Sequence, residues 1–221
     1  MSLNEELKKK FDKCISNNIN LSNYSWFNLG GPAEYFFKPL NESQLIEFFK
    51  INKKNKLNIT ILGAGSNTLI RDNGIKGVVI KLGSSFSEIK LKDKLTIKAG
   101  AATLDRKISN FAKENCIGGL EFLSCIPGSI GGSVIMNSGC YGSDISKVLV
   151  SINVVDIKSC LEKEIKFEEI EFYYRGNNLS KNLIITSVTL KGKIESRPII
   201  EKNQRNLIEK KKLTQPSQIK T

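Results

Sequence analysis

The chain has 221 residues, of which 40% are hydrophobic and 25% are charged, and its net charge is +12. These values are typical of a soluble globular protein with a sizeable core. A transmembrane protein is also excluded, because no apolar run in the sequence approaches the roughly 20 residues that span a bilayer. The complete absence of histidine also excludes histidine-based catalytic triads.

The five cysteines are dispersed and have no metal-like spacing, so we expect reduced thiols and no bound metal. They are Cys14, Cys116, Cys125, Cys140 and Cys160. The first ten residues are polar and charged, without the apolar segment of a secretory signal. A cytoplasmic protein is therefore expected.

The lysines are spread along the chain rather than gathered with aromatic residues. We interpret the basic charge as a compositional bias, with a nucleic-acid binder as an alternative that no motif supports. Arginine is scarce, and in a lysine-rich chain its planar guanidinium indicates a specific role. The five arginines are Arg71, Arg106, Arg175, Arg197 and Arg205.

The first expected element is an amphipathic helix, predicted by apolar residues at four-residue spacing from Leu3 to Ile15. A strand follows at residues 34–38. Asn41 and Gln44 then resemble a capping box, which would open a helix through about Lys54. A short apolar strand at residues 59–62 comes next.

This strand leads into a glycine loop, Gly63-Ala64-Gly65-Ser66-Asn67. A dinucleotide fingerprint needs a third glycine, but position 68 is threonine, and residues 70–74 predict a turn where a Rossmann fold needs a helix. The Rossmann interpretation therefore fails. A loop between two strands can still hold a pyrophosphate through backbone N–H groups, with donors added by Ser66 and Asn67. The alternative is an ordinary tight connection.

Further strands are expected at residues 77–82 and 95–100, and Thr103 is expected to cap a helix that runs to Asn115. Strands at residues 148–157 and 184–190 precede a final helix at residues 197–212. Short strands mixed with helices in this order indicate an α+β fold.

A second glycine-rich stretch runs from Leu120 to Gly142 and holds five of the 17 glycines. Small or apolar residues at 133–136 separate its two glycine groups and can pack on a sheet while neighbouring amides stay free for a flat or extended ligand. The alternative is a pair of turns that join buried strands. Because this stretch and the loop at residues 63–67 have the same character, we expect them to bind one ligand together.

Taken in order along nearly the whole chain, these motifs resemble the UDP-N-acetylenolpyruvoylglucosamine reductase family. The matching segments are Trp26-Phe27, Gly30-Gly31-Pro32-Ala33, Gly63-Ala64-Gly65-Ser66-Asn67, Arg71-Asp72, Gly74, Gly119-Leu120-Glu121-Phe122-Leu123, Ile126-Pro127-Gly128, Gly131-Gly132, Met136-Asn137, Gly139, Tyr141-Gly142, Tyr174-Arg175 and Thr214-Gln215-Pro216. Each segment alone is weak evidence for the family, but all of them in the same order along the chain are specific.

The resemblance implies an FAD-binding fold of the vanillyl-alcohol-oxidase or PCMH type, with the flavin between lobes at residues 1–82 and 83–221. It implies FAD as cofactor, NADPH as reductant, and reduction of a UDP-sugar enolpyruvyl ether to UDP-N-acetylmuramate for the bacterial cell wall by a monomer. The cofactor-binding residues so expected are Gly63, Ala64, Gly65, Ser66, Asn67, Thr68, Pro127, Gly128, Ser129, Gly131, Gly132, Asn137 and Gly139.

The same resemblance makes Arg175 the catalytic arginine, and it places Tyr174 and Arg175 at the substrate. A fixed guanidinium can hold a carboxylate while negative charge develops during the reaction. The alternative for Arg175 is a surface ion pair with Glu169 or Glu171.

The chain departs from the family pattern at several places. Gly176-Asn177-Asn178 follows the arginine, where the family usually has Ser or Thr two residues later, and Cys140 replaces a usual alanine, which should be tolerated because cysteine is also small and apolar. The family also continues beyond Thr-Gln-Pro into a domain that supplies a serine proton donor and a glutamate, which cannot be assigned here. We therefore expect FAD binding with incomplete or absent turnover, and a stand-alone FAD-binding module stays the alternative.

Overall fold

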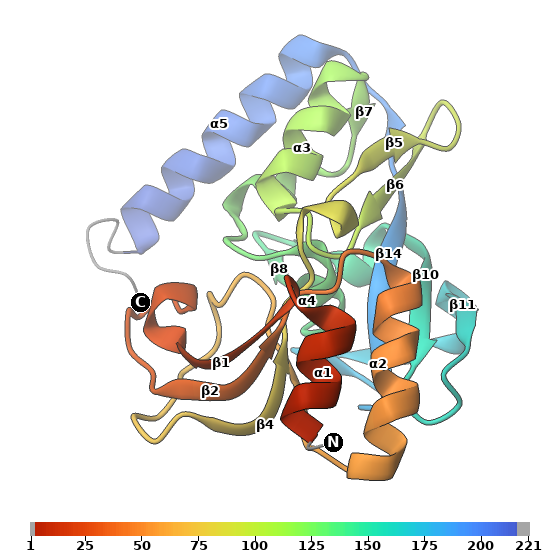
Figure 1. Ribbon diagram of the computed structural model, residues 1–221. Coiled ribbons are helices and arrows are strands. Elements are labelled where there is room, and N and C mark those ends of the chain that lie inside the picture. The colour runs from red at the N-terminus through yellow and green to blue at the C-terminus, as the bar shows by residue number, and fades with distance from the viewer. Residues whose placement is uncertain (1–2, 216–221) are drawn as a thin grey trace.

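The computed structural model describes residues 3–215 and shows two sheets with helices packed around them (Figure 1). The first sheet has four strands in the order β1-β2-β4-β3. The first lobe contains this sheet and two helices. Its elements are α1 (Leu3–Phe11), β1 (Ile15–Asn20), β2 (Pro32–Phe37), α2 (Glu42–Asn55), β3 (Ile59–Ile61) and β4 (Ile75–Ile80). Strands β2 and β3 run parallel to β4, whereas β1 is antiparallel to β2.

The second sheet has five antiparallel strands in the order β11-β10-β14-β6-β5. Its elements are β5 (Ile89–Leu91), β6 (Thr96–Gly100), α3 (Asp105–Glu114), α4 (Ile130–Ile135), β10 (Leu149–Asp156), β11 (Glu162–Lys166), β14 (Leu183–Lys191) and α5 (Arg197–Thr214). Two-residue strands complete the lobe: β7 (Ile117–Gly118), β8 (Gly139–Cys140), β9 (Ser143–Asp144), β12 (Phe172–Tyr173), β13 (Gly176–Asn177) and β15 (Lys193–Ile194). Helix α5 runs beside α3 along one edge of the molecule (Figure 1).

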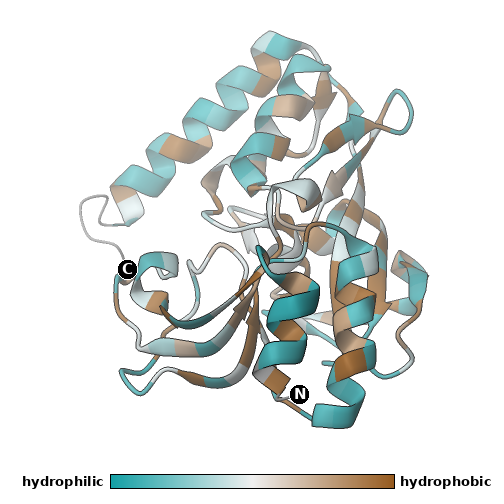
Figure 2. Cartoon of the chain, in the orientation of Figure 1, coloured by the Kyte–Doolittle hydropathy of each residue, from teal (hydrophilic) through white to brown (hydrophobic). Residues whose placement is uncertain are grey.

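The core of the first lobe is aromatic. Helices α1 and α2 lie side by side on the first sheet, and the rings of Phe11, Phe37 and Phe48 contact one another at centroid distances of 4.8–6.2 Å. Apolar and polar residues alternate along both helices (Figure 2), as expected for amphipathic helices that pack on a core. Val155 and Ile184, at the ends of β10 and β14, join the same cluster. The two sheets are therefore tied together, although the expected lobe boundary at residue 82 falls between them.

The first helix is shorter than its apolar spacing predicts. It ends at Phe11, and Ile15 instead begins strand β1, where it is buried and paired with Phe37. Pairing with a buried strand satisfies the Ile15 backbone and side chain together, so the tertiary contact overrides the local helical pattern.

The two expected helix caps have different outcomes. Asn41 Oδ1 accepts a hydrogen bond from Gln44 N at 2.9 Å, and Gln44 Oε1 accepts one from Leu40 N at 2.9 Å, so the start of α2 is capped much as expected. The prediction that Thr103 caps α3 is wrong. The cap position is Leu104, and the buried Thr103 hydroxyl has no hydrogen-bond partner among the described residues.

Helix α5 is mostly polar (Figure 2), and one buried side chain locks it to α3. Gln204 Nε2 donates to the hydroxyl and the carbonyl of Ser109 at 2.7 and 3.1 Å. Replacement of Gln204 with leucine should lower the free energy of unfolding by about 1–3 kcal/mol, because Ser109 is left buried without its partner. Urea unfolding would measure this. The double variant Gln204→Leu/Ser109→Ala should recover much of the loss, and a double variant no better than the single one would contradict the explanation.

Within residues 3–215, no helix is long and apolar enough to cross a membrane.

Candidate functional site

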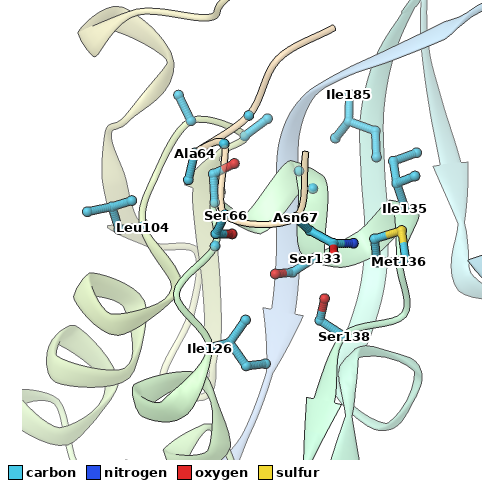
Figure 3. A pocket seen from close by; sticks show the side chains of 18 of the residues that line it. Ala64, Ser66, Asn67, Leu104, Ile126, Ser133, Ile135, Met136, Ser138 and Ile185 are labelled. Atoms are coloured by element: carbon cyan, nitrogen blue, oxygen red, sulfur yellow. The ribbon is translucent and has the colours of Figure 1, made fainter. Parts of the chain in front are cut away.

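The two glycine-rich stretches meet in one cleft. A Cβ atom on Gly63 would lie 2.8 Å from Ser129 Oγ, so the loop after β3 contacts the segment before α4. The cleft has a volume of about 2160 Å³ and is lined by residues of both lobes. This exceeds the roughly 300–1,000 Å³ of an ordinary small-ligand pocket, so an extended ligand fits. Figure 3 shows Ala64, Ser66 and Asn67 lining the pocket together with Ser133 and Ile135 of α4.

Backbone N–H groups are the main free donors of this cleft. In the described part of the chain, the amides of residues 63–68, Ser129 and Gly132 donate no hydrogen bond to the protein, and all eight residues line the cleft. Several carbonyls of the loop are occupied instead: Gly65 O accepts from Trp26 N at 3.0 Å, and Thr68 O accepts from Ser25 Oγ at 3.3 Å. A loop fixed through its carbonyls, with its N–H groups open, is suited to an anionic ligand.

Gly65 explains why this loop needs glycine. Its φ is +75°, and a Cβ there would lie 2.0 Å from Tyr24 O. Any other residue would meet both backbone strain and a direct clash. The contact with Tyr24 is thus part of how the loop is held in place.

The second stretch is more ordered than the sequence predicts. Residues 130–135 form the short helix α4, and the amides of Ile130 and Gly131 donate to Thr103 O and Ala101 O, each at 2.9 Å. The amide of Gly131 is therefore not one of the free donors of this stretch. Gly131 serves close packing instead, since a Cβ there would lie 2.9 Å from that of Ala101.

A buried carboxyl supports this stretch from behind. Asp105, at the start of α3, is fully buried and accepts a hydrogen bond from Ser133 Oγ at 2.7 Å, while its Oδ1 has no hydrogen-bond partner among the described residues. Burial raises the pKa of Asp105 to about 7, against the opposing effect of the hydrogen bond from Ser133.

This carboxyl should make stability fall as pH rises. In the unfolded chain Asp105 ionises near pH 3.8, but in the folded chain only near pH 7, so the folded state binds the extra proton between these values. Stability is lost across that window, by roughly 4 kcal/mol in total at 1.36 kcal/mol per pKa unit. Asp105→Asn should be more stable than the wild type at pH 8 and similar near pH 4, as measured by urea unfolding. The matched control is Asp93→Asn, because hydrogen bonding lowers the pKa of Asp93 and its pH dependence should have the opposite sign.

Most of the expected site residues lie together. Of the expected cofactor-binding set, all but Asn137 line the cleft. Asn137 is buried and braces the wall: its Nδ2 donates to Tyr173 O at 3.2 Å, and its Oδ1 accepts from Ser146 N at 3.1 Å. Tyr174 also lies outside the lining, with a side chain that is 87% exposed.

Arg175 lies at the cleft. Its Nη2 donates to Gly139 O at 3.4 Å, and its guanidinium lies 5.2 Å from the Tyr174 ring centroid. Within residues 3–215 it pairs with no carboxylate, so the ion pair with Glu169 or Glu171 that the sequence left open is not formed. A guanidinium without a counter-ion at a cleft can receive an anionic group of a ligand.

The charge of the cleft is a feature that the sequence motifs did not predict. Eight basic side chains line it and, in the described part of the chain, no acidic one does. They are Lys13, Lys38, Lys81, Arg106, Arg175, Lys181, Lys211 and Lys212. These residues are far apart in sequence, so no local run indicates them. Together they favour a ligand that carries several negative charges.

Comparison with known proteins agrees with this geometry. A family profile described as an FAD binding domain matches residues 33–159. UDP-N-acetylenolpyruvoylglucosamine reductase of Pelagibacter ubique is 45% identical over 222 residues, which cover 98% of this chain and 72% of the relative. The chain belongs to the UDP-N-acetylenolpyruvoylglucosamine reductase family. The reductase of Rickettsia rickettsii is 48% identical over 172 residues, or 78% of this chain and 57% of the relative.

Solved structures place the fold as well. The reductase of this family from Thermus caldophilus superposes with a TM-score of 0.79 at 28% identity and covers 91% of this chain and 70% of its own. p-Cresol methylhydroxylase with bound substrate superposes with a TM-score of 0.61 at 12% identity. The match covers 86% of this chain and 42% of the methylhydroxylase chain. The chain is thus an α+β FAD-binding flavoprotein of the PCMH type, as the sequence predicted, and it spans between about half and three quarters of these reductase-family relatives.

Proposed function

We propose that this chain binds FAD in the cleft and takes part in the NADPH-dependent reduction of UDP-N-acetylglucosamine enolpyruvate to UDP-N-acetylmuramate. The observation that carries the proposal is the meeting of the two glycine stretches in one cleft, where backbone amides of both stretches donate no hydrogen bond to the described part of the chain and no described acidic residue lines the cleft. FAD carries a pyrophosphate, the UDP-sugar a diphosphate, and NADPH several phosphates. All three ligands suit a basic cleft.

The residues present fit FAD. The amides of residues 63–68 would hold the pyrophosphate, with Ser66 and Asn67 as further donors. Pro127, Gly128, Ser129 and Gly132 would form a wall without bulky side chains, on which a flat ring can lie. When bound, FAD would supply the capacity to take hydride from NADPH and pass it to the substrate.

Arg175 would act on the substrate. Its guanidinium would hold the substrate carboxylate and stabilise the negative charge that develops next to it during reduction. The hydrogen bond to Gly139 O keeps the guanidinium at the cleft. Tyr174 would contribute through its ring, which contacts the Arg175 guanidinium, and Asn137 through the wall that it braces.

Further parts of the proposal concern the whole protein. We propose that it works as a cytoplasmic monomer on small molecules, without a nucleic-acid or membrane partner, and that the lobes meet near residue 82. The convergence of basic residues on the cleft supports small anionic ligands, whereas no nucleic-acid-binding motif of the sequence supports a nucleic-acid partner.

The test is an absorption spectrum followed by a rate measurement. The purified 221-residue chain, reconstituted with FAD and freed of excess, should show the two visible bands of bound flavin. NADPH oxidation is then followed with and without the enolpyruvyl substrate. Stimulation by substrate supports the reductase, whereas bound flavin without stimulation supports a stand-alone FAD-binding module. A chain that binds no FAD would refute both.

A further inference from the structure

Two lysines outside the glycine motifs share one aromatic ring. The ammonium group of Lys38 lies 5.0 Å from the Tyr24 ring centroid and that of Lys81 lies 6.0 Å from it. Lys38 Nζ also donates to Tyr24 Oη at 3.3 Å and lies 5.3 Å from the Phe36 ring centroid. Both lysines line the cleft.

This arrangement brings like charges together without a counter-ion. Among residues 3–215, neither lysine forms an ion pair with a carboxylate. Burial and the nearby charge of Lys38 both lower the pKa of Lys81. The two ammonium groups therefore repel each other, and an anion bound beside them would offset that repulsion.

The pair is built into the glycine loop. Lys81, just after β4, donates from Nζ to Gly63 O, the first carbonyl of the loop whose amides are open at residues 63–68. Gly63 in turn contacts Ser129 across the cleft. The two ammonium groups and the open amides therefore belong to one continuous surface, and an ammonium group next to a backbone nest is a common way of binding phosphate.

We propose that the ammonium groups of Lys38 and Lys81, held at the Tyr24 ring beside the loop of residues 63–68, bind a phosphate group of a dinucleotide. The proposal rests on the proposed binding of FAD. The FAD pyrophosphate is the favoured source, because Lys81 is bonded to the loop itself. NADPH is the other dinucleotide of the proposed reaction that carries phosphate groups.

The experiment measures dissociation constants for FAD, riboflavin and NADPH with Lys38→Gln, Lys81→Gln and the double variant. Loss of each charge-assisted hydrogen bond should weaken FAD binding about tenfold, and the double variant about a hundredfold. Riboflavin has no phosphate and should bind all variants alike. The affinity of the wild type for FAD should also fall more steeply with added salt than that of the double variant.

Two controls make the result interpretable. Lys94→Gln removes an equal charge from the β5–β6 turn, outside the cleft, and should leave FAD binding unchanged. Lys38→Arg/Lys81→Arg keeps both charges and should stay within about threefold of the wild type. Thermal melting of each variant checks that it is folded.

The outcomes distinguish FAD from NADPH as the source of the phosphate. They also distinguish failure of the lysine-pair inference from failure of the proposed function. Weaker FAD binding supports the pyrophosphate, and weaker NADPH binding with unchanged FAD supports a phosphate of NADPH. If the double variant binds FAD and NADPH within about twofold of the wild type, the lysine pair is no phosphate site, although FAD binding itself stands. A wild-type chain that does not bind FAD would instead refute the proposed function, and this inference with it.

Discussion

Replacing Gly65 with alanine should weaken FAD binding by at least about a hundredfold. The φ of +75° costs a residue with a Cβ roughly 1 kcal/mol or more, and the 2.0 Å approach to Tyr24 O forces the backbone of one segment to move. Overpacking of this kind costs a further 1–3 kcal/mol or so. The displaced loop can no longer present its open amides to one ligand.

The matched control for this prediction is Gly119→Ala. Gly119 has a φ of +90°, but a Cβ there meets nothing within 4 Å, and the residue lies outside the cleft. It therefore reproduces the backbone strain without the clash. Fluorescence titration with FAD should show near wild-type affinity for Gly119→Ala and a large loss for Gly65→Ala. Equal affinities in the two variants would show that the contact with Tyr24 does not hold the loop.

The sequence was sufficient for the parts of the cleft that depend on local chain geometry. A glycine loop between strands can expose its backbone amides, so residues 63–68 could be proposed as an anion-binding loop without a structure. The short helix α4 could not be predicted, because glycines at 131 and 132 are poor helix formers. Their helical state depends on hydrogen bonds from Ile130 and Gly131 to Thr103 and Ala101, which are distant in sequence.

The charge of the cleft could not be predicted for a similar reason. Lys13, Lys38, Lys81 and Lys211 are routine lysines in a lysine-rich chain, and only the fold brings them to one surface. Asn137 is a further case. Its place in a family motif predicts a ligand contact, and the fold adds hydrogen bonds between its side-chain amide and the backbones of Tyr173 and Ser146, so its support for the wall is visible only in three dimensions.

Changing Arg175 to lysine should lower the rate of substrate reduction about a hundredfold while FAD binding stays unchanged. Lysine keeps the positive charge but loses the planar fork that can hold a carboxylate through two hydrogen bonds. Removal of one donor that stabilises developing charge typically costs 10²–10³ in rate, so about a hundredfold is expected for this milder change. The backbone at Arg175 is left-handed, with φ of 60°, and lysine meets the same strain, so the fold is not the cause.

A rate measurement and a binding measurement together test this role. NADPH oxidation gives the rate, and the dissociation constant of the FAD-loaded chain for the enolpyruvyl UDP-sugar reports on Arg175 even where turnover is slow. Arg197→Lys is the control, because Arg197 forms an ion pair with Glu114 at 2.9 Å on the surface, where such pairs contribute little. If Arg175→Lys and Arg197→Lys change rate and substrate affinity equally, Arg175 has no special role. A loss confined to Arg175→Lys, with intact flavin absorbance, would mean that its guanidinium is aligned with the substrate carboxylate.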